Sequence, residues 1–218
     1  MKKDYTDMTV LLDRSGSMQV IRNDMEGGFN SFRDEQKKLP GILKISLYQF
    51  DDTFEEVYIG KDSHDVPDLE LFPRGSTALI DSAYKAIIKT GERINAMKDN
   101  DKPEKVIFII ITDGMENASH EMNRTQLKKL IETQTKKWSW EFVYIGANQD
   151  SFAEATSYGI NTVNTMHYSA DTKSVNVAFV NLSCATTRSR SAKVGDTGGY
   201  FDAGETNVDT ESVDDNGN

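Results

Sequence analysis

The sequence contains a single cysteine, Cys184, so the chain forms no internal disulfide bond. Because such scarcity fits a reducing compartment, we expect a cytoplasmic protein. Apolar runs are also short, and none approaches the ~18 consecutive residues that a membrane-spanning helix requires. The N-terminal stretch MKKDYTDMTV lacks the apolar core of a secretory signal. We therefore expect no membrane partner.

Positive charge is scarce too, since 25 Lys and Arg stand against 35 Asp and Glu and give a net charge of −10. Sequence-independent binding of nucleic acid needs a basic face, so we expect no nucleic-acid partner. The acidity is uneven: residues 195–218 hold seven acidic residues and no Lys or Arg, which leaves −3 for residues 1–194. We predict a folded domain over 1–194 and an acidic, disordered tail over 195–218.

Two hydrophobic periods alternate along the chain. In residues 21–32 apolar side chains recur three or four positions apart, which indicates an amphipathic helix. The run VIFIII at 106–111 has no alternation, which indicates a strand buried on both faces at the centre of a sheet. The predicted strands are 7–12, 42–50, 54–59, 106–111, 141–145 and 162–167. The predicted helices are 21–39, 77–97, 123–137, 151–158 and 171–192.

The order of these elements predicts a doubly wound α/β fold. Strands that alternate with helices form mostly parallel sheets with helices on both faces. Strands 42–50 and 54–59 are the exception, because the short turn DDT between them makes an antiparallel hairpin with 54–59 at the sheet edge. We therefore predict a mostly parallel, six-stranded sheet with one antiparallel edge strand.

Side chains with oxygen ligands follow the strands at the carboxyl edge, where open α/β sheets bind ligands. The first strand ends in Asp13, which begins D-x-S-x-S with Ser15 and Ser17. The fourth strand is followed by Asp113 in TDG, and the loop PRGST places Thr77 at the start of a helix. Neighbouring carboxylates repel unless a cation or proton separates them, and an all-oxygen set favours a hard ion. We therefore predict Mg²⁺, with Mn²⁺ or Ca²⁺ as alternatives.

These three segments resemble the metal-ion-dependent adhesion site (MIDAS) of von Willebrand factor A (vWA) domains. The resemblance covers roughly residues 5–192, and all five positions of the motif match. A polar turn that caps the next helix is the alternative for the first segment alone. The resemblance implies a Rossmann-like sheet and an intracellular bacterial or phage member, because LLDRSGSM and ITDGMEN are most similar to those. The direct ligands that it implies are Ser15, Ser17 and Thr77, with Asp13 and Asp113 as water-mediated or switching ligands.

The resemblance implies a binding module and not an enzyme. Ions in this family commonly complete their coordination with a Glu or Asp of a partner protein, and some intracellular members work beside AAA+ ATPases. We therefore expect a Mg²⁺-dependent protein-binding module, with an AAA+ ATPase as a candidate partner. A structural component, for example of a phage, with a merely stabilising ion remains an alternative.

A metal-dependent phosphatase or hydrolase is the other alternative, and the sequence disfavours it. Phosphatases of the haloacid dehalogenase type carry D-x-D after the first strand, whereas Ser15 occupies the second position here. The sequence also has neither a G-x-S-x-G elbow nor a G-x-x-x-x-G-K-[ST] loop.

Other polar residues near the predicted carboxyl edge are predicted to have structural or solvent-exposed roles and not to bind the ion. Arg14 is predicted to point outward, beside the ion or into solvent, and Asp51 and Asp52 are predicted hairpin-turn residues. Glu116 and Asn117 are predicted solvated loop residues at the rim of the site.

The segment after strand 141–145 also lies at the carboxyl edge, with Gly146, Asn148 and Gln149. A loop and helix cap is favoured there over contact with a ligand. Cys184 is predicted to be inert core on the apolar face of the last helix. The histidines, none of which has metal-ligand spacing, are His64, His120 and His167.

Overall fold

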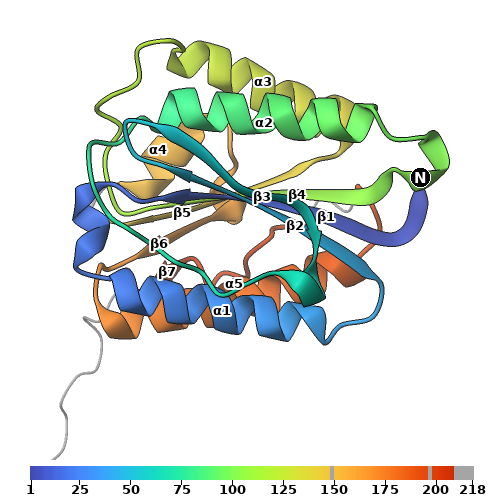
Figure 1. Cartoon of the computed structure of the whole chain (residues 1–218), viewed down its shortest axis with the longest axis horizontal. Helices are drawn as coiled ribbons and strands as arrows, with labels where there is room; N and C mark the ends of the chain where they lie inside the picture. Colours follow the sequence, from blue (N-terminus) through green and yellow to red (C-terminus); the bar gives the residue numbers. More distant parts are fainter. Residues whose placement is uncertain (148–149, 196–197, 209–218) are drawn as a thin grey trace, which may run out of the picture.

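The computed structural model describes residues 1–147, 150–195 and 198–208, and these residues form one seven-stranded sheet covered by helices (Figure 1). The strand order is β3-β2-β1-β4-β5-β6-β7. The strands are β1 (Lys2–Asp13), β2 (Ile42–Phe50), β3 (Phe54–Asp62), β4 (Pro103–Thr112), β5 (Glu141–Ala147), β6 (Thr165–Tyr168) and β7 (Asn207–Val208). The α-helices are α1 (Arg22–Lys37), α2 (Leu79–Asn95), α3 (Arg124–Trp138), α4 (Ser151–Ser157) and α5 (Thr172–Ser191).

The predicted fold class is confirmed. Strand β3 pairs antiparallel with β2, and every other neighbouring pair in the sheet is parallel. Helices α1 and α5 cover one face of the sheet, and α2 and α3 cover the other (Figure 1). The hairpin forms because only the short turn 51–53 joins β2 to β3, which leaves no room for a crossover.

The core is divided by β4, the central apolar strand. Ile107, Ile109 and Ile111 point into the layer beneath α1 and α5, whereas Phe108 and Ile110 point into the layer beneath α2 and α3. All five are buried, with at most 1% of each exposed. The unbroken apolar run therefore corresponds to a strand buried on both faces, as predicted.

The sheet has seven strands, one more than predicted, and the seventh lies in the stretch predicted to be a disordered tail. Tyr200 and Phe201 are buried, and Asn207 and Val208 pair with β6. The segment was predicted to be disordered because its acidic residues outnumber its few apolar ones. In the structure Arg188 of α5 forms an ion pair with Glu205 and offsets part of this negative charge. Residues 196–197 and 209–218 of the predicted tail lie outside the described residues.

Strand β1 also begins earlier than predicted, at Lys2 and not at residue 7. Its early part is polar, and Asp7 is fully buried because Arg93 of α2 donates two hydrogen bonds to its carboxylate, at 2.8 and 2.7 Å. Asp7 interrupts the apolar pattern of β1, and the sequence does not show that Arg93, 86 positions away, allows it to be buried. Among the described residues, no helix is long and apolar enough to cross a membrane.

Candidate metal site

The segments predicted to form the site converge at the carboxyl edge of the sheet. Strands β1 and β4 are direct neighbours, with Leu12 opposite Ile111, so the residues that follow them emerge side by side. Asp13 is the last residue of β1, and Asp113 follows the last residue of β4. The loop that carries Thr77 reaches the same place, because Gly75 accepts a backbone hydrogen bond from Gly16 at 3.3 Å.

Three hydroxyl groups of this cluster lie close to Gly114. A Cβ atom added to Gly114 would lie 3.1 Å from Thr77 Oγ1, 3.5 Å from Ser17 Oγ and 3.6 Å from Ser15 Oγ. The two serine oxygens are 3.2 Å apart, and Ser17 Oγ donates to Asp113 Oδ1 at 2.6 Å. Because glycine has no side chain, the Thr77 hydroxyl can approach position 114 this closely, and a larger residue would crowd the three hydroxyls.

Asp13 lies behind these hydroxyls and is fully buried. Its Oδ1 accepts a hydrogen bond from the Ser15 backbone N–H, and its Oδ2 accepts one from Thr112 Oγ1, both at 2.6 Å. With both oxygens held by neutral donors, Asp13 is fixed next to the serines. The structure thus brings together all five predicted residues; their role as ligands remains a prediction.

The electrostatics of the cluster favour a cation. Burial raises the pKa of Asp13 to about 6 despite hydrogen bonds from Thr112 and Ser15, and the charge of Asp113 adds to the rise. Burial raises the pKa of Asp113 as well, although the Ser17 hydrogen bond lowers it. Both shifts mean that the negative charges are poorly stabilised by the protein, and a divalent cation among these oxygens would stabilise them. The all-oxygen donor set fits a hard ion such as Mg²⁺.

Glu116 is half-buried and Asn117 is exposed, as predicted for the rim, and both residues also hold the Thr77 segment in place. Asn117 Oδ1 accepts a hydrogen bond from the Thr77 backbone N–H at 2.9 Å, and the Asn117 N–H donates to Thr77 O at 3.1 Å. Glu116 Oε2 accepts from Ile80 N at 2.8 Å, in the first turn of α2, where the N-cap residue Ala78 has no side-chain acceptor. The loop after Asp113 therefore fixes the position of the Thr77 backbone relative to the end of β4.

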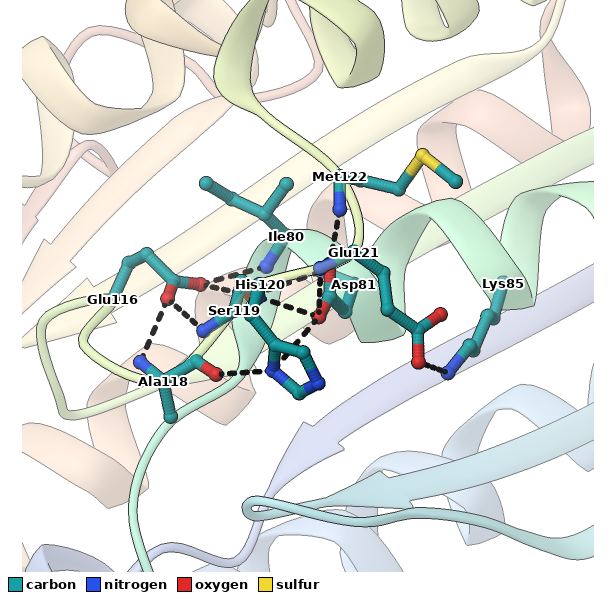
Figure 2. A network of polar contacts seen from close by, with 9 residues as sticks. All are labelled: Ile80, Asp81, Lys85, Glu116, Ala118, Ser119, His120, Glu121 and Met122. Atoms are coloured by element: carbon teal, nitrogen blue, oxygen red, sulfur yellow. Dashed lines mark hydrogen bonds and ion pairs between the residues drawn. The ribbon is translucent and has the colours of Figure 1, made fainter.

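The same loop is anchored further along by Asp81, as Figure 2 shows. The buried carboxylate of Asp81 accepts hydrogen bonds from the backbone N–H groups of His120, Glu121 and Met122, the shortest at 2.7 Å. Burial would raise the pKa of Asp81, but these hydrogen bonds lower it below its ordinary value.

Asp81, His120 and Glu121 also bring three ligand-type atoms close together, so this group is a second candidate for a metal ion among the described residues. However, the Asp81 oxygens already accept backbone hydrogen bonds, and Glu121 forms an ion pair with Lys85 at 3.0 Å. We interpret the group as the anchor that holds the loop 113–122 to α2, which is a structural role.

Arg14 points inward, so the prediction of an outward side chain was wrong. Its Nε donates to Asp51 Oδ2 at 2.9 Å, Glu55 is a second ion-pair partner, and only 5% of the residue is exposed. Arg74 donates to the same Asp51 oxygen at 2.9 Å. Asp51 is therefore more than a turn residue: it joins the turn after β1 to the loop that leads to Thr77.

Burial alone would raise the pKa of Asp51, but hydrogen bonds from Thr53 and Arg74 and the charge of Arg14 hold it well below its ordinary value. The sequence offered no signal for this ion pair, because the partners are 37 positions apart and meet only through the pairing of β1 with β2.

The remaining predictions for this edge have mixed outcomes. Gly146 is required by packing, since a Cβ there would lie 2.6 Å from Ser151 Oγ. Asn148 and Gln149 lie outside the described residues. Cys184 is exposed, so its assignment to the core was wrong. The buried face of α5 is formed by neighbours such as Leu182 and Ala185, and Cys184 falls just outside this stripe.

Tyr168 is a residue near the site that the sequence did not single out. It is fully buried, and within the described part of the chain its hydroxyl has no hydrogen-bond partner. Burial raises its pKa well above the ordinary value, and the charges of Asp113 and Asp13 add to the rise. Tyr168 lines a small apolar cavity of about 10 Å³ together with residues of α1, β4, β5 and α5.

Sequence comparison finds no matching protein family and no matching curated protein. Solved structures are similar in fold. One is VWA2, the ArnB paralog of Sulfolobus acidocaldarius, which is 19% identical, with a TM-score of 0.52 over 84% of this chain and 46% of that one. Another is proximal thread matrix protein 1 of the mussel byssus with a zinc-occupied MIDAS motif, 16% identical, with a TM-score of 0.54 over 85% of this chain and 45% of that one.

A third similar structure is the manganese-loaded TRAP protein of Plasmodium vivax, 16% identical, with a TM-score of 0.52 over 83% of this chain and 73% of that one. The chain spans less than half the length of the mussel and Sulfolobus proteins. At these identities the likeness concerns the fold alone. The chain has the fold of vWA domains.

Proposed function

We propose that the protein is a non-enzymatic binding module in which a divalent cation at the carboxyl edge coordinates a carboxylate of a partner protein. One observation carries the proposal: the hydroxyls of Ser15, Ser17 and Thr77 lie together next to Gly114 and beside two buried aspartates. Mg²⁺ is the ion that we propose, with Mn²⁺ or Ca²⁺ as alternatives, because every donor is a hard oxygen.

The donor set explains why such an ion would bind an acidic partner. In the proposed arrangement Ser15, Ser17 and Thr77 bind the ion directly with neutral hydroxyls, and Asp13 and Asp113 act mainly from behind them. Neutral ligands leave most of the positive charge on the ion. An incoming Glu or Asp side chain then meets a strongly electrophilic site, and Ser17 is exposed on the side from which it would arrive.

Two of the similar structures are metal-bound, which supports the proposal of a metal ion. The mussel protein carries zinc in its MIDAS motif, and the Plasmodium protein is manganese-loaded. The resemblance to intracellular bacterial and phage members extends the proposal to a cytoplasmic module that works beside a larger assembly such as an AAA+ ATPase. The absence of a nucleophile elbow and a phosphate loop from the sequence supports a role other than catalysis.

Calorimetry on the full chain tests the metal site first. We expect Mg²⁺ and Mn²⁺ to bind wild type with one site, and Thr77→Ala to weaken that binding at least about tenfold, in line with the loss of a metal ligand. Thr135→Ala on the exposed surface of α3 is the matched control and should bind the ion like wild type.

Capture of a protein partner tests the second half of the proposal. We expect capture in Mg²⁺ that is lost in EDTA and in Thr77→Ala but retained in Thr135→Ala. Equal capture by all of these would contradict the proposed role of the ion. Hydrolysis of a simple phosphoester by wild type, lost in Asp13→Asn, would favour the hydrolase alternative instead.

A further inference from the structure

We infer that Tyr168 is a positioning residue for the candidate metal site: its buried hydroxyl donates a hydrogen bond to the carboxylate of Asp113 when an ion occupies the site. The inference rests on the proposed function, because it needs the ion, but it does not need the partner protein. It gives a role to a buried polar group that has no hydrogen-bond partner among the described residues.

The Tyr168 hydroxyl differs from those of other buried tyrosines. The hydroxyl of Tyr158 donates to Glu154 at 2.8 Å, and that of Tyr200 lies 2.6 Å from Thr186 Oγ1. Tyr168 is fully buried, and within the described ranges no group forms a hydrogen bond with its oxygen. A buried hydroxyl without a partner is energetically costly, so a group that pairs with it in another state of the protein would explain why tyrosine occupies this position.

Tyr168 lies at the carboxyl edge of the sheet, level with Asp113. It is the last residue of β6 and lies opposite Ala147 of β5, while Gly146, one residue earlier, lies opposite Thr112 at the end of β4. Only β5 separates β6 from β4 (Figure 1), so the two backbones are ~10 Å apart. A tyrosine side chain that crosses β5 covers most of this distance.

The side chain of Tyr168 extends across β5 towards β4. Tyr168 and Ile111 of β4 line the same cavity of about 10 Å³. The other side chains that line this cavity are Met25, Ile145, Val175, Ala178 and Phe179. Because a cavity of this size holds at most one water, the side chains around it are close neighbours. Asp113 follows Ile111 by two positions and so emerges on the same face of the sheet, where Ser17, before α1, contacts it.

Asp113 is the acceptor that the surroundings of the hydroxyl favour. The cavity offers no partner, because its other side chains are apolar. Burial raises the pKa of Tyr168, and the nearby charges of Asp113 and then Asp13 add to the rise. Both oxygens of Asp13 already accept short hydrogen bonds, from Ser15 N and Thr112 Oγ1. Of the two carboxylates, Asp113 is therefore the one to which Tyr168 donates.

The dependence on the ion follows from the contact between Asp113 and Ser17. In the structure Ser17 Oγ donates to Asp113 Oδ1 at 2.6 Å. In the proposed site the same serine oxygen is a ligand of the ion, and the carboxylate of Asp113 turns towards β6. A phenol that donates to a carboxylate forms a strong, charge-assisted hydrogen bond. The Tyr168 hydroxyl thus holds the carboxylate in the orientation that suits the ion.

The variant Tyr168→Phe tests the inference, because it keeps the ring and removes the hydroxyl. By calorimetry on the full chain we expect Mg²⁺ affinity to fall about tenfold, as for other groups that orient a metal ligand. In EDTA we expect the urea midpoint of unfolding to equal or exceed that of wild type, because a buried hydroxyl without a partner has been removed. A role in packing alone would not change the affinity for the ion.

Tyr58→Phe is the matched control. The Tyr58 hydroxyl is also buried without a partner in the described part of the chain, and burial raises its pKa. Tyr58 lies in β3, at the opposite edge of the sheet from β6. The same chemical change there should leave Mg²⁺ affinity unchanged, with a urea midpoint in EDTA equal to that of wild type or higher.

Carbon-13 nuclear magnetic resonance of the aspartate carboxyl groups reports whether the hydroxyl acts through Asp113, whose signal is identified with Asp113→Asn. In saturating Mg²⁺ we expect the Asp113 signal of Tyr168→Phe to differ from that of wild type, whereas in EDTA the two should coincide. Tyr58→Phe should match wild type in both conditions.

The other outcomes contradict the inference in distinguishable ways. Unchanged Mg²⁺ affinity in Tyr168→Phe would overturn it and leave the metal site intact. A lower affinity with an unchanged Asp113 signal in Mg²⁺ would rule out Asp113 as the acceptor. Equal losses of affinity in both tyrosine variants, or a lower midpoint of Tyr168→Phe in EDTA, would indicate a general effect on packing. No binding of Mg²⁺ by wild type would contradict the metal site itself and, with it, the proposed function.

Discussion

Two buried aspartates lie at the ends of neighbouring strands, and their charges are stabilised differently: Asp13 is the last residue of β1, and Asp51 follows β2. Both are fully buried, but Asp51 is paired with Arg14 and Arg74, whereas the hydrogen bonds to Asp13 come from Ser15 N and Thr112 Oγ1, which are neutral. Arg14 even follows Asp13 in the sequence and turns to Asp51 instead. The pKa of Asp51 is lowered and that of Asp13 is raised.

This difference distinguishes a carboxylate whose charge the protein balances from one whose charge it does not balance. At Asp51, as at Asp7, an arginine supplies an internal cation. At Asp13 no internal cation offsets the desolvation of the carboxylate, and ionisable groups with pKa values shifted in this way are typical of functional sites. We propose that an external cation balances it, and the following predictions test the two aspartates against each other.

Replacing Asp51 should have the largest effect on stability. In Asp51→Asn the buried guanidinium of Arg14 loses its main partner, so we expect the free energy of unfolding in EDTA to fall by about 3 kcal/mol. Urea denaturation measures it. Asp52→Asn, the exposed neighbour, is the matched control and should change it by less than about 0.5 kcal/mol.

The effect of Asp51→Asn should depend on pH in a defined direction. Because the folded-state pKa of Asp51 is lowered, its contribution to stability is present above the unfolded-state pKa and is lost as the pH falls. The difference between wild type and Asp51→Asn should therefore shrink below about pH 4. A difference that grows on acidification would contradict the assigned ion pairs.

Replacing Asp13 should affect the response to the ion and not the stability of the ion-free chain. We expect Asp13→Asn to unfold in EDTA with the same free energy as wild type or a slightly higher one, because the uncompensated buried charge is gone. Wild type should gain about 2.7 kcal/mol in Mg²⁺ at a hundredfold excess over Kd, and the variant should gain almost nothing. If Asp13→Asn lost as much stability in EDTA as Asp51→Asn does, Asp13 would stabilise the ion-free chain, which contradicts the proposed difference between the two aspartates.

A smaller effect is expected at Asn117, which holds Thr77 without being a proposed ligand. Asn117→Ala removes the acceptor of the Thr77 N–H, so we expect metal affinity to fall about 10- to 100-fold. Asn123→Ala is the matched control, since Asn123 caps α3 through Gln126 N and its loss should cost a similar ~1 kcal/mol of stability. Unchanged metal affinity in both variants would show that Asn117 does not position the site.

The sequence predicted the residues of the candidate site because each lies within a few positions of a strand or helix end. Strand ends follow from hydrophobic patterns, and the carboxyl edge of a parallel sheet brings them together. The clamp formed by Glu116 and Asn117 escaped prediction because its acceptors bind backbone groups some 40 positions away. Such pairings depend on the packed structure and leave no local pattern.

Strand β7 and Arg14 escaped prediction for the same physical reason. Strand β7 has two residues, and its apolar contact Val208 is surrounded by acidic positions, so no period of two is visible. Arginine is usually exposed to solvent, and Arg14 is buried because it forms an ion pair with Asp51, which follows the neighbouring strand β2. In both cases tertiary contacts override the local signal.

A crystal structure with Mn²⁺, in which anomalous scattering locates the metal, tests the proposed site most directly. We expect one ion bound by the hydroxyl oxygens of Ser15, Ser17 and Thr77 at about 2.1–2.2 Å, near the distances of hard octahedral ions. An ion held by Asp81, His120 and Glu121, with none beside Ser15 and Ser17, would contradict it.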